Sequence, residues 1–178
     1  MHTRALRAAL LLACVAPGAC RTATQVGASQ AGPATADSIV LERTRCYGTC
    51  PAYRLSVAAA GQVAFTSRNP GDEGRSARDS TTPGAFAGLV REAREIGFFA
   101  LPDTIAADRT LCPAESTDSP TATVTVFARA GTKQVVDYRG CGGGADPEAR
   151  RRVAALRALE ARIDSVAGSS RWVRPARR

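Results

Sequence analysis

Six cysteines behind an apolar N-terminal stretch constrain this chain more than any other feature of its sequence. Residues 1–20 begin with two arginines, Arg4 and Arg7, followed by an apolar run from Ala8 to Ala16. Such a run is too short to cross a bilayer as a helix and is typical of a secretory signal peptide. We therefore expect an exported protein whose cysteines meet an oxidising compartment and form disulfides.

The leader ends in Gly18-Ala19-Cys20, which resembles the lipobox of a bacterial lipoprotein. Cys20 is therefore the expected lipidation site, and the chain would be anchored to a bacterial membrane facing the periplasm or the exterior. Leu11-Leu12-Ala13-Cys14 is a rival match, because Pro17 stands where the motif usually has leucine. Choosing Cys14 would leave an apolar run of about six residues, below the roughly 7–15 expected. Secretion without a lipid is the alternative.

The rest of the chain divides into three parts. Residues 21–37 are small and polar, which predicts a flexible tether. Residues 38–168 carry the strand and helix patterns of one domain, and residues 169–178 form a basic tail. A domain of about 130 residues can bury a single core of modest size. Because aromatic residues make up only 5% of the chain, we expect cross-links to add to its stability.

Apolar periodicity predicts five strands and two helices in the domain. Strands are expected near residues 39–45, 53–58, 63–65, 122–128 and 133–139, and polar loops at 68–82 and 102–120. One helix is expected between Thr82 and Gly97, and the other between Asp146 and Gly168, since these residues suit helix caps. The order β-β-β-α-β-β-α predicts an α+β domain with a mostly antiparallel sheet and two helices packed on it.

Four cysteines remain once the two in the leader are set aside: Cys46, Cys50, Cys112 and Cys141. Four cysteines allow three connectivities, and spacing alone does not choose among them. We favour Cys46–Cys50, because Gly48 allows the turn between them to tighten, together with Cys112–Cys141. On the chain-entropy model the long bridge stabilises by about 3.5 kcal/mol and the short one by about 2 kcal/mol.

The remaining composition excludes several classes of enzyme. The one histidine, His2, lies in the leader, so a mature chain has no imidazole for triad catalysis or for histidine-containing zinc and copper sites. The one lysine, Lys133, belongs to no phosphate-binding loop. Acidic residues in the long loop show neither paired-carboxylate nor calcium-ligand spacing: Asp103, Asp108, Glu115 and Asp118. We therefore expect no enzymatic activity and no cofactor.

Two further functional hypotheses arise from the spacing of Cys46 and Cys50 and from the arginines of the C-terminal part. The spacing Cys46-x-x-x-Cys50-Pro51 also occurs in Sco-type copper chaperones, so thiol-redox or copper-handling work is the alternative function. Those chaperones use a distant histidine that a mature chain would lack. From Pro147 onward nine arginines face three acidic residues, which accounts for +6 of the net charge of +8. This favours a solvated helix face or adhesion to anionic envelope surfaces, and we expect no nucleic-acid partner.

The cysteine turn belongs to a longer pattern that resembles a known family. The pattern comprises the run from Arg43 to Tyr53 (RTRCYGTCPAY), a helix ending in Gly97-Phe98-Phe99, the step Thr117-Asp118-Ser119-Pro120, and a Val-x-Asp-Tyr strand. It resembles a bacterial domain-of-unknown-function family found in exported and lipid-anchored proteins. The resemblance supports pairing each cysteine couple internally, because the Cys112/Cys141 couple occurs in only some members. It implies no activity, so we expect a binding or structural module with an envelope protein or polymer as its partner.

Overall fold

Alternating side chains build a single antiparallel sheet in the computed structural model, which describes residues 32–174. The predicted signal peptide, Cys14, Cys20 and the first part of the tether lie outside the described residues. The strands are β1 (Ser38–Arg43), β2 (Tyr53–Ala58), β3 (Gln62–Ser67), β4 (Ser76–Ser80), β5 (Thr121–Ala128) and β6 (Gly131–Tyr138). They lie in the order β4-β3-β2-β1-β5-β6, and all neighbours are antiparallel.

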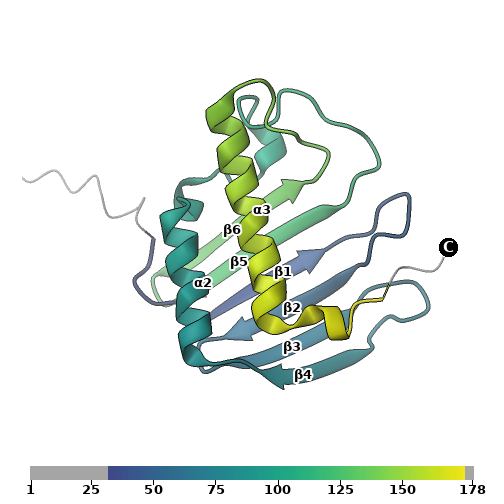
Figure 1. Cartoon of the computed structure of the whole chain (residues 1–178), viewed down its shortest axis with the longest axis vertical. Helices are drawn as coiled ribbons and strands as arrows, with labels where there is room; N and C mark the ends of the chain where they lie inside the picture. The colour runs from purple at the N-terminus through teal and green to yellow at the C-terminus, as the bar shows by residue number, and fades with distance from the viewer. Residues whose placement is uncertain (1–31, 175–178) are drawn as a thin grey trace, which may run out of the picture.

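Two helices cover one face of this sheet, as Figure 1 shows. Helix α2 (Pro83–Glu95) begins at Thr82, whose side chain accepts a hydrogen bond from the Ala85 backbone N–H at 3.0 Å. Helix α3 (Pro147–Ala167) begins at Asp146, which caps the Glu148 N–H, and ends at Gly168 in the left-handed conformation. The predicted α+β class, antiparallel sheet and pair of helices are confirmed.

Strand β4 corrects the prediction of a continuous polar loop over residues 68–82. Its sequence, Ser-Ala-Arg-Asp-Ser, has no apolar period, yet it pairs along its whole length with β3. The strand lies at the edge of the sheet, where backbone hydrogen bonds to one neighbour hold it and only Ala77 packs against the core. Charged and polar residues on an edge strand discourage pairing with other chains, so apolar periodicity does not detect such a strand.

The core lies between the helices and the inner face of the sheet. The inner strands contribute alternate residues to it, as in β2, where Tyr53, Leu55 and Val57 are buried. The stripe of α3 contains Val153, Leu156, Leu159 and Ile163 as predicted. Glu160 is buried in the same stripe, which the apolar pattern did not predict.

The two ends of the described chain pack on this domain. Ala36, in the segment predicted to be a tether, is buried, and the Asp37 N–H donates to the Phe127 carbonyl at 2.7 Å. At the other end Trp172 lies 5.6 Å from the Phe65 ring, measured between centroids. The last residues of the predicted tether and the first residues of the predicted tail therefore belong to the folded unit.

The structure brings both favoured cysteine couples to disulfide distance. The Cα atoms are 5.5 Å apart in Cys46–Cys50 and 5.1 Å apart in Cys112–Cys141. We expected Gly48 to be needed for the tight turn, but the structure does not require glycine there. Its φ is not positive, and an added Cβ would meet only the Cys46 sulfur, at 3.7 Å. Glycine is required at Gly61, in the β2–β3 turn, where φ is +90° and a Cβ would collide with the Thr81 carbonyl.

The two bridges should differ in their effect on stability. Removing Cys112–Cys141 by a double alanine substitution opens a loop with a sequence separation of 29, against 4 for Cys46–Cys50. We expect losses of about 3.5 and about 2 kcal/mol respectively in the free energy of unfolding, measured by urea denaturation. A larger loss from removing Cys46–Cys50 would contradict the loop-entropy explanation.

Candidate functional site

Three segments of the sequence pattern meet at one end of the sheet, the end towards which the β1 and β6 arrows point in Figure 1. Thr44 and Thr121 exchange two hydrogen bonds, from the Thr44 N–H to the Thr121 carbonyl and from the Thr121 N–H to Thr44 Oγ1. The Tyr47 N–H donates to the Asp118 carbonyl at 3.3 Å, and the Arg139 N–H donates to the Pro120 carbonyl at 2.9 Å. The strand order, with β1 beside β5, therefore joins the cysteine turn to the Thr117–Pro120 step.

Tyr138 and Asp118 hold this junction in shape. The Tyr138 hydroxyl donates to the Ser116 carbonyl at 2.8 Å and accepts from the Ser119 N–H. Asp118 is the one non-glycine residue among residues 32–174 with positive φ, at +61°. Aspartate tolerates that conformation better than most residues do, so its role here is in the turn.

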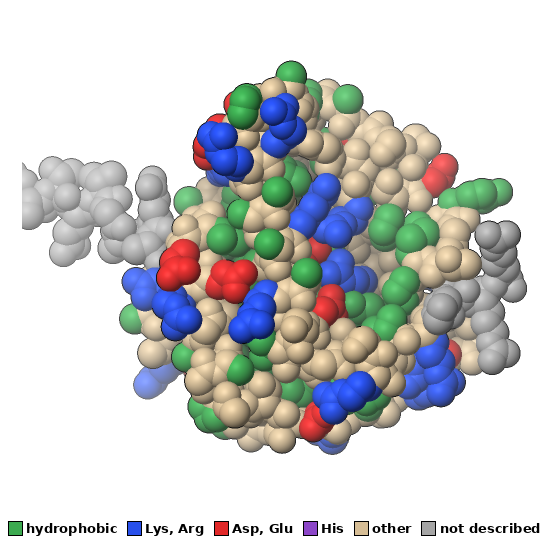
Figure 2. Space-filling view, viewed as in Figure 1, with side chains coloured by type: hydrophobic (Ala, Val, Ile, Leu, Met, Phe, Trp, Pro, Cys, Tyr) green, Lys and Arg blue, Asp and Glu red, His purple; other side chains and the backbone are tan. Residues whose placement is uncertain are grey.

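Six charged side chains alternate in sign between α3 and the sheet, and we call them the charge ladder: Arg157, Asp137, Arg139, Glu160, Arg43 and Asp164. Neighbouring members are 2.8 to 3.2 Å apart, and three come from α3 while the others come from β1 and β6 or the residue after it. Figure 2 shows basic side chains lined up beside α3 on this face. Every member has a partner of opposite charge, as burial of charged groups requires.

Glu160 is the most buried group of the ladder, with no exposed side-chain surface. Its Oε2 accepts from Arg43 Nη1 at 3.1 Å and from Arg139 Nη1 at 2.9 Å, while Oε1 has no hydrogen-bond partner. Burial raises the pKa of this carboxyl to about 7, and the two arginines only partly oppose the shift. Glu160 therefore changes its charge near neutral pH.

Asp164 ends the ladder with a saturated carboxylate. It accepts hydrogen bonds from Arg43 Nε and Nη2, from the Tyr53 hydroxyl and from the Ser169 hydroxyl. Burial, followed by the negative charge of Asp164, raises the pKa of Tyr53 well above its usual value. Tyr53 is therefore a neutral donor that fixes Asp164, and both residues are held rigidly.

A cleft opens above these residues, and we call it the motif cleft. It has a volume of about 290 Å³ and is lined by Arg43, Thr44, Cys50, Pro51, Tyr53, Pro120, Thr121, Arg139 and Asp164. Arginines, a tyrosine and an aspartate contribute its polar groups, and Cys50 with the two prolines contributes apolar surface. Small cavities that combine apolar walls with a few convergent polar groups are the usual form of a binding site.

Tyr47 projects beside this cleft. It lies in the turn closed by Cys46–Cys50, and 91% of its surface is exposed, the largest exposed fraction of any large hydrophobic residue among residues 32–174. The Cys46–Cys50 bridge is partly exposed, whereas Cys112–Cys141 is buried. An aromatic side chain that is held out by a short closed turn is a feature typical of contact surfaces.

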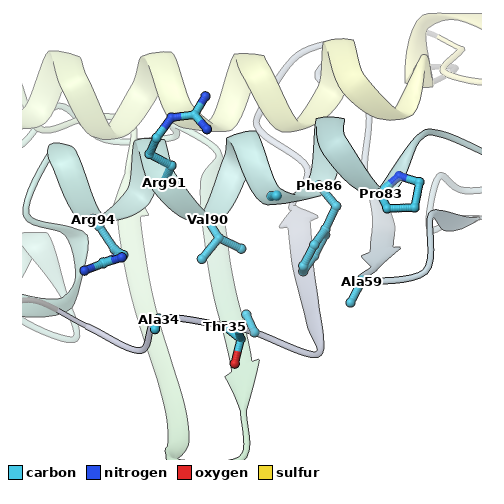
Figure 3. A pocket seen from close by; sticks show the side chains of 10 residues that line it. Ala34, Thr35, Ala59, Pro83, Phe86, Val90, Arg91 and Arg94 are labelled. Carbon is cyan, nitrogen blue, oxygen red and sulfur yellow. The ribbon is translucent and has the colours of Figure 1, made fainter.

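A second cavity of about 300 Å³ lies between α2 and residues 34–36. Figure 3 shows Phe86 and Val90 pointing into it, while Arg91 points away from that segment. Its walls are mostly alanine, proline, valine and phenylalanine. It has no set of converging polar groups and is the weaker candidate.

The acidic residues of the long loop do not come together. Asp103 pairs with Lys133 at 2.5 Å, and Asp108 accepts from the Thr110 N–H at 2.8 Å. Glu115 lies elsewhere, where its backbone forms an isolated antiparallel β-bridge with Cys141. Within the described part of the chain no group of three or more His, Cys, Asp or Glu side chains is placed to hold a metal ion. The same residues 32–174 contain no helix long and apolar enough to cross a membrane.

Several of the C-terminal arginines form ion pairs with acidic residues of the domain. Arg157 lies in the charge ladder, Arg151 pairs with Glu148, and Arg171 pairs with Asp79. Arg177 and Arg178 are outside the described residues. Three of the nine arginines from residue 147 onward therefore lie in local ion pairs.

A family model for a domain of unknown function, DUF6438, matches residues 37–167. The chain belongs to the DUF6438 family. The matched range contains every residue of the charge ladder and of the motif cleft. A comparison with curated proteins finds no match. The function of this DUF6438 domain must therefore be argued from its own site.

Sequence reasoning missed Glu160, Arg139 and Asp164 as parts of one site. The sequence does contain a signal for Glu160, which stands four residues after Leu156 and three before Ile163, on the apolar face of α3. An acidic residue in such a position needs a buried basic partner. Arg43 and Arg139 could be matched to it only once β1 and β6 were known to lie under the helix.

Replacing Glu160 should change how stability depends on pH. Folding raises the Glu160 pKa from 4.5 to about 7, so its contribution to stability is complete below pH 4.5 and is lost as the pH rises through 7. We expect the wild type to lose stability relative to Glu160→Gln between pH 5 and pH 8.5, by on the order of 2 kcal/mol, in urea denaturation. Parallel pH profiles of the two proteins would contradict a raised Glu160 pKa.

Proposed function

We propose that this DUF6438 domain is a non-catalytic binding module, held in a bacterial envelope by a lipid on Cys20. The observation that carries the binding proposal is the pairing of the exposed Tyr47 with the motif cleft. Tyrosine is enriched among residues that dominate binding energy, because it offers a large contact area at a small cost in side-chain entropy. The partner would be an envelope protein or polymer.

Rigidity of the surface supports this proposal. The Cys46–Cys50 bridge closes the turn that carries Tyr47, and the Tyr47 N–H is fixed on the Asp118 carbonyl. The cleft floor is held by the charge ladder. Surfaces that are ordered before binding lose less entropy when a partner arrives. This end of the sheet is therefore better suited to recognition than a mobile loop would be.

Export is supported by the two disulfides, which are typical of oxidising compartments, whereas the anchor rests on the lipobox-like Gly18-Ala19-Cys20 in the sequence. Intact-mass analysis of the membrane fraction tests the anchor. A mature chain that begins at Cys20 and carries a diacylglycerol adduct is the expected result. A chain that begins after Cys20 without a lipid would leave a secreted binding module.

A partner should be captured at position 47. We expect a photo-crosslinking amino acid at Tyr47 to give one discrete adduct in intact cells, several-fold more abundant than with the same replacement at Phe127. Phe127 is 37% exposed and lies near the other end of β5, so it controls for random collisions. Since Tyr47 is exposed, the replacement should leave stability within about 0.5 kcal/mol.

The crosslinking result has two clear outcomes. One adduct at position 47, diminished in the same background by Arg139→Gln, supports a binding site at the motif cleft. Equal and diffuse adducts at positions 47 and 127 would contradict it. The mass of a discrete adduct also separates a protein partner from an envelope polymer.

Thiol-redox or copper-handling work is the second candidate function. It is favoured by the partial exposure of Cys46–Cys50, which leaves this bridge accessible to a reductant while Cys112–Cys141 is buried. Reactive bridges are exposed and have high reduction potentials, whereas structural bridges in exported proteins lie below about −300 mV.

The reduction potential of Cys46–Cys50 separates the two functions. For a structural brace we expect a value below about −300 mV, measured by mass spectrometry after equilibration with dithiothreitol mixtures. The buried Cys112–Cys141 bridge in the same molecule is the internal control. A value near −200 mV, or stoichiometric binding of Cu(I) by the reduced turn, would favour the redox or copper function.

A further inference from the structure

Arg139 is the member of the charge ladder that lines the motif cleft and still has N–H groups without a hydrogen-bond acceptor. Its Nη1 donates to Glu160 and Asp137, while Nε and Nη2 have no acceptor among residues 32–174. Its side chain is 31% exposed and lines the cleft. Arg43, by contrast, uses all three of its nitrogens on Tyr53, Asp164 and Glu160.

The acidic group in the cleft does not compete for an incoming ligand. Asp164 accepts four hydrogen bonds, two of them from Arg43, so its lone pairs are occupied and its charge is balanced. The ladder as a whole contains three arginines and three carboxylates. Of the three ladder residues that line the cleft, Arg43 and Asp164 have their charged atoms paired, so the donors left without an acceptor are Nε and Nη2 of Arg139, which suit an acceptor with two oxygens.

The walls limit the size and character of that acceptor. Pro51, Pro120 and Cys50 line the cleft and offer apolar contacts. The volume of about 290 Å³ lies just below the roughly 300–1,000 Å³ range of ligand pockets, so the group bound is small. A carboxylate at the end of a short, mostly apolar chain fits both the donors and the walls.

We propose that the motif cleft binds a ligand carboxylate, which Nε and Nη2 of Arg139 hold as a bidentate pair. This rests on the proposed binding function and names the chemical group that the site recognises. The carboxylate could belong to the C-terminus of a peptide or to a small free acid. Arginine presents paired N–H groups whose geometry matches a carboxylate, which a lysine at this position would not do.

Glu160 makes this binding depend on pH. The charged and ionisable groups around it are Arg43 on β1, Asp137 on β6, Arg139 directly after β6, and Arg157 and Asp164 on α3. Protonation of Glu160 removes a competing negative charge from Arg139, while a ligand carboxylate stays ionised down to about pH 4. Affinity should therefore rise several-fold between pH 8 and pH 6, and Glu160→Gln should remove this dependence.

The test uses nuclear magnetic resonance on the folded mature domain, with four probes: N-acetyl-Ala-Ala, its C-terminal amide, acetate and inorganic phosphate. We expect N-acetyl-Ala-Ala to shift the Arg139 Nε–Hε signal and to bind at least tenfold more tightly than its amide. Arg139→Gln should weaken binding at least tenfold, and Arg139→Lys should restore it only in part. Arg129→Gln, in the exposed turn between β5 and β6, is the matched control and should change nothing.

Each outcome decides the proposal. Tighter binding of the peptide than of acetate assigns the carboxylate to a peptide chain end, and equal binding assigns it to a small acid. An unmoved Arg139 signal, equal affinity for acid and amide, or binding of phosphate alone would overturn it. The wild-type signal remains decisive even if Arg139→Gln fails to fold. Crosslinking at Tyr47 without carboxylate binding would leave the binding function standing and reject only this ligand.

Discussion

Burial of alternating charges between α3 and the sheet is the constraint on which the rest of the domain depends. Each carboxylate or guanidinium in such a place loses its hydration, so each needs partners of opposite charge at good geometry. Glu160 meets this need by contacting Arg43 from β1 and Arg139 beyond β6 at the same time. A shift of α3 along the sheet would break both contacts and leave a buried charge alone. The ladder therefore fixes where the helix lies, which apolar packing by itself specifies less sharply.

The same side chains that fix the helix form the floor of the motif cleft. Arg43 and Arg139 each have one side directed to the buried carboxylates and lie in the cleft wall as well. Their orientation is therefore set before any ligand arrives. Above them the Cys46–Cys50 bridge braces the rim through a covalent bond, and Tyr47 projects from it. The ion pairs of the charge ladder and the Cys46–Cys50 disulfide together make this end of the sheet a rigid surface.

The sequence was informative where a pattern had a regular period and uninformative where it did not. The strands of the core and both helices follow from alternation and from caps such as Thr82 and Asp146. Strand β4 has no apolar face, because it lies at the edge, and was missed. Glu160 was missed because an apolar pattern predicts which face of a helix is buried but does not identify a single acidic residue on that face. The meeting of the cysteine turn with Pro120 and Arg139 needs the order β2-β1-β5-β6, in which β1 gains a neighbour far away in the chain.

Stability alone does not account for the ladder. Buried ion pairs can often be replaced by apolar side chains of similar volume with no loss, and sometimes with a gain, in stability. Glu160 also has a pKa near neutrality because of its burial, so its ionised form opposes folding relative to a protonated or apolar residue. What an apolar residue could not do is hold Arg139 by its Nη1, in a position where Nε and Nη2 have no acceptor among residues 32–174. An acidic residue on the buried face of α3 is therefore consistent with the proposed site and is not explained by packing of the core.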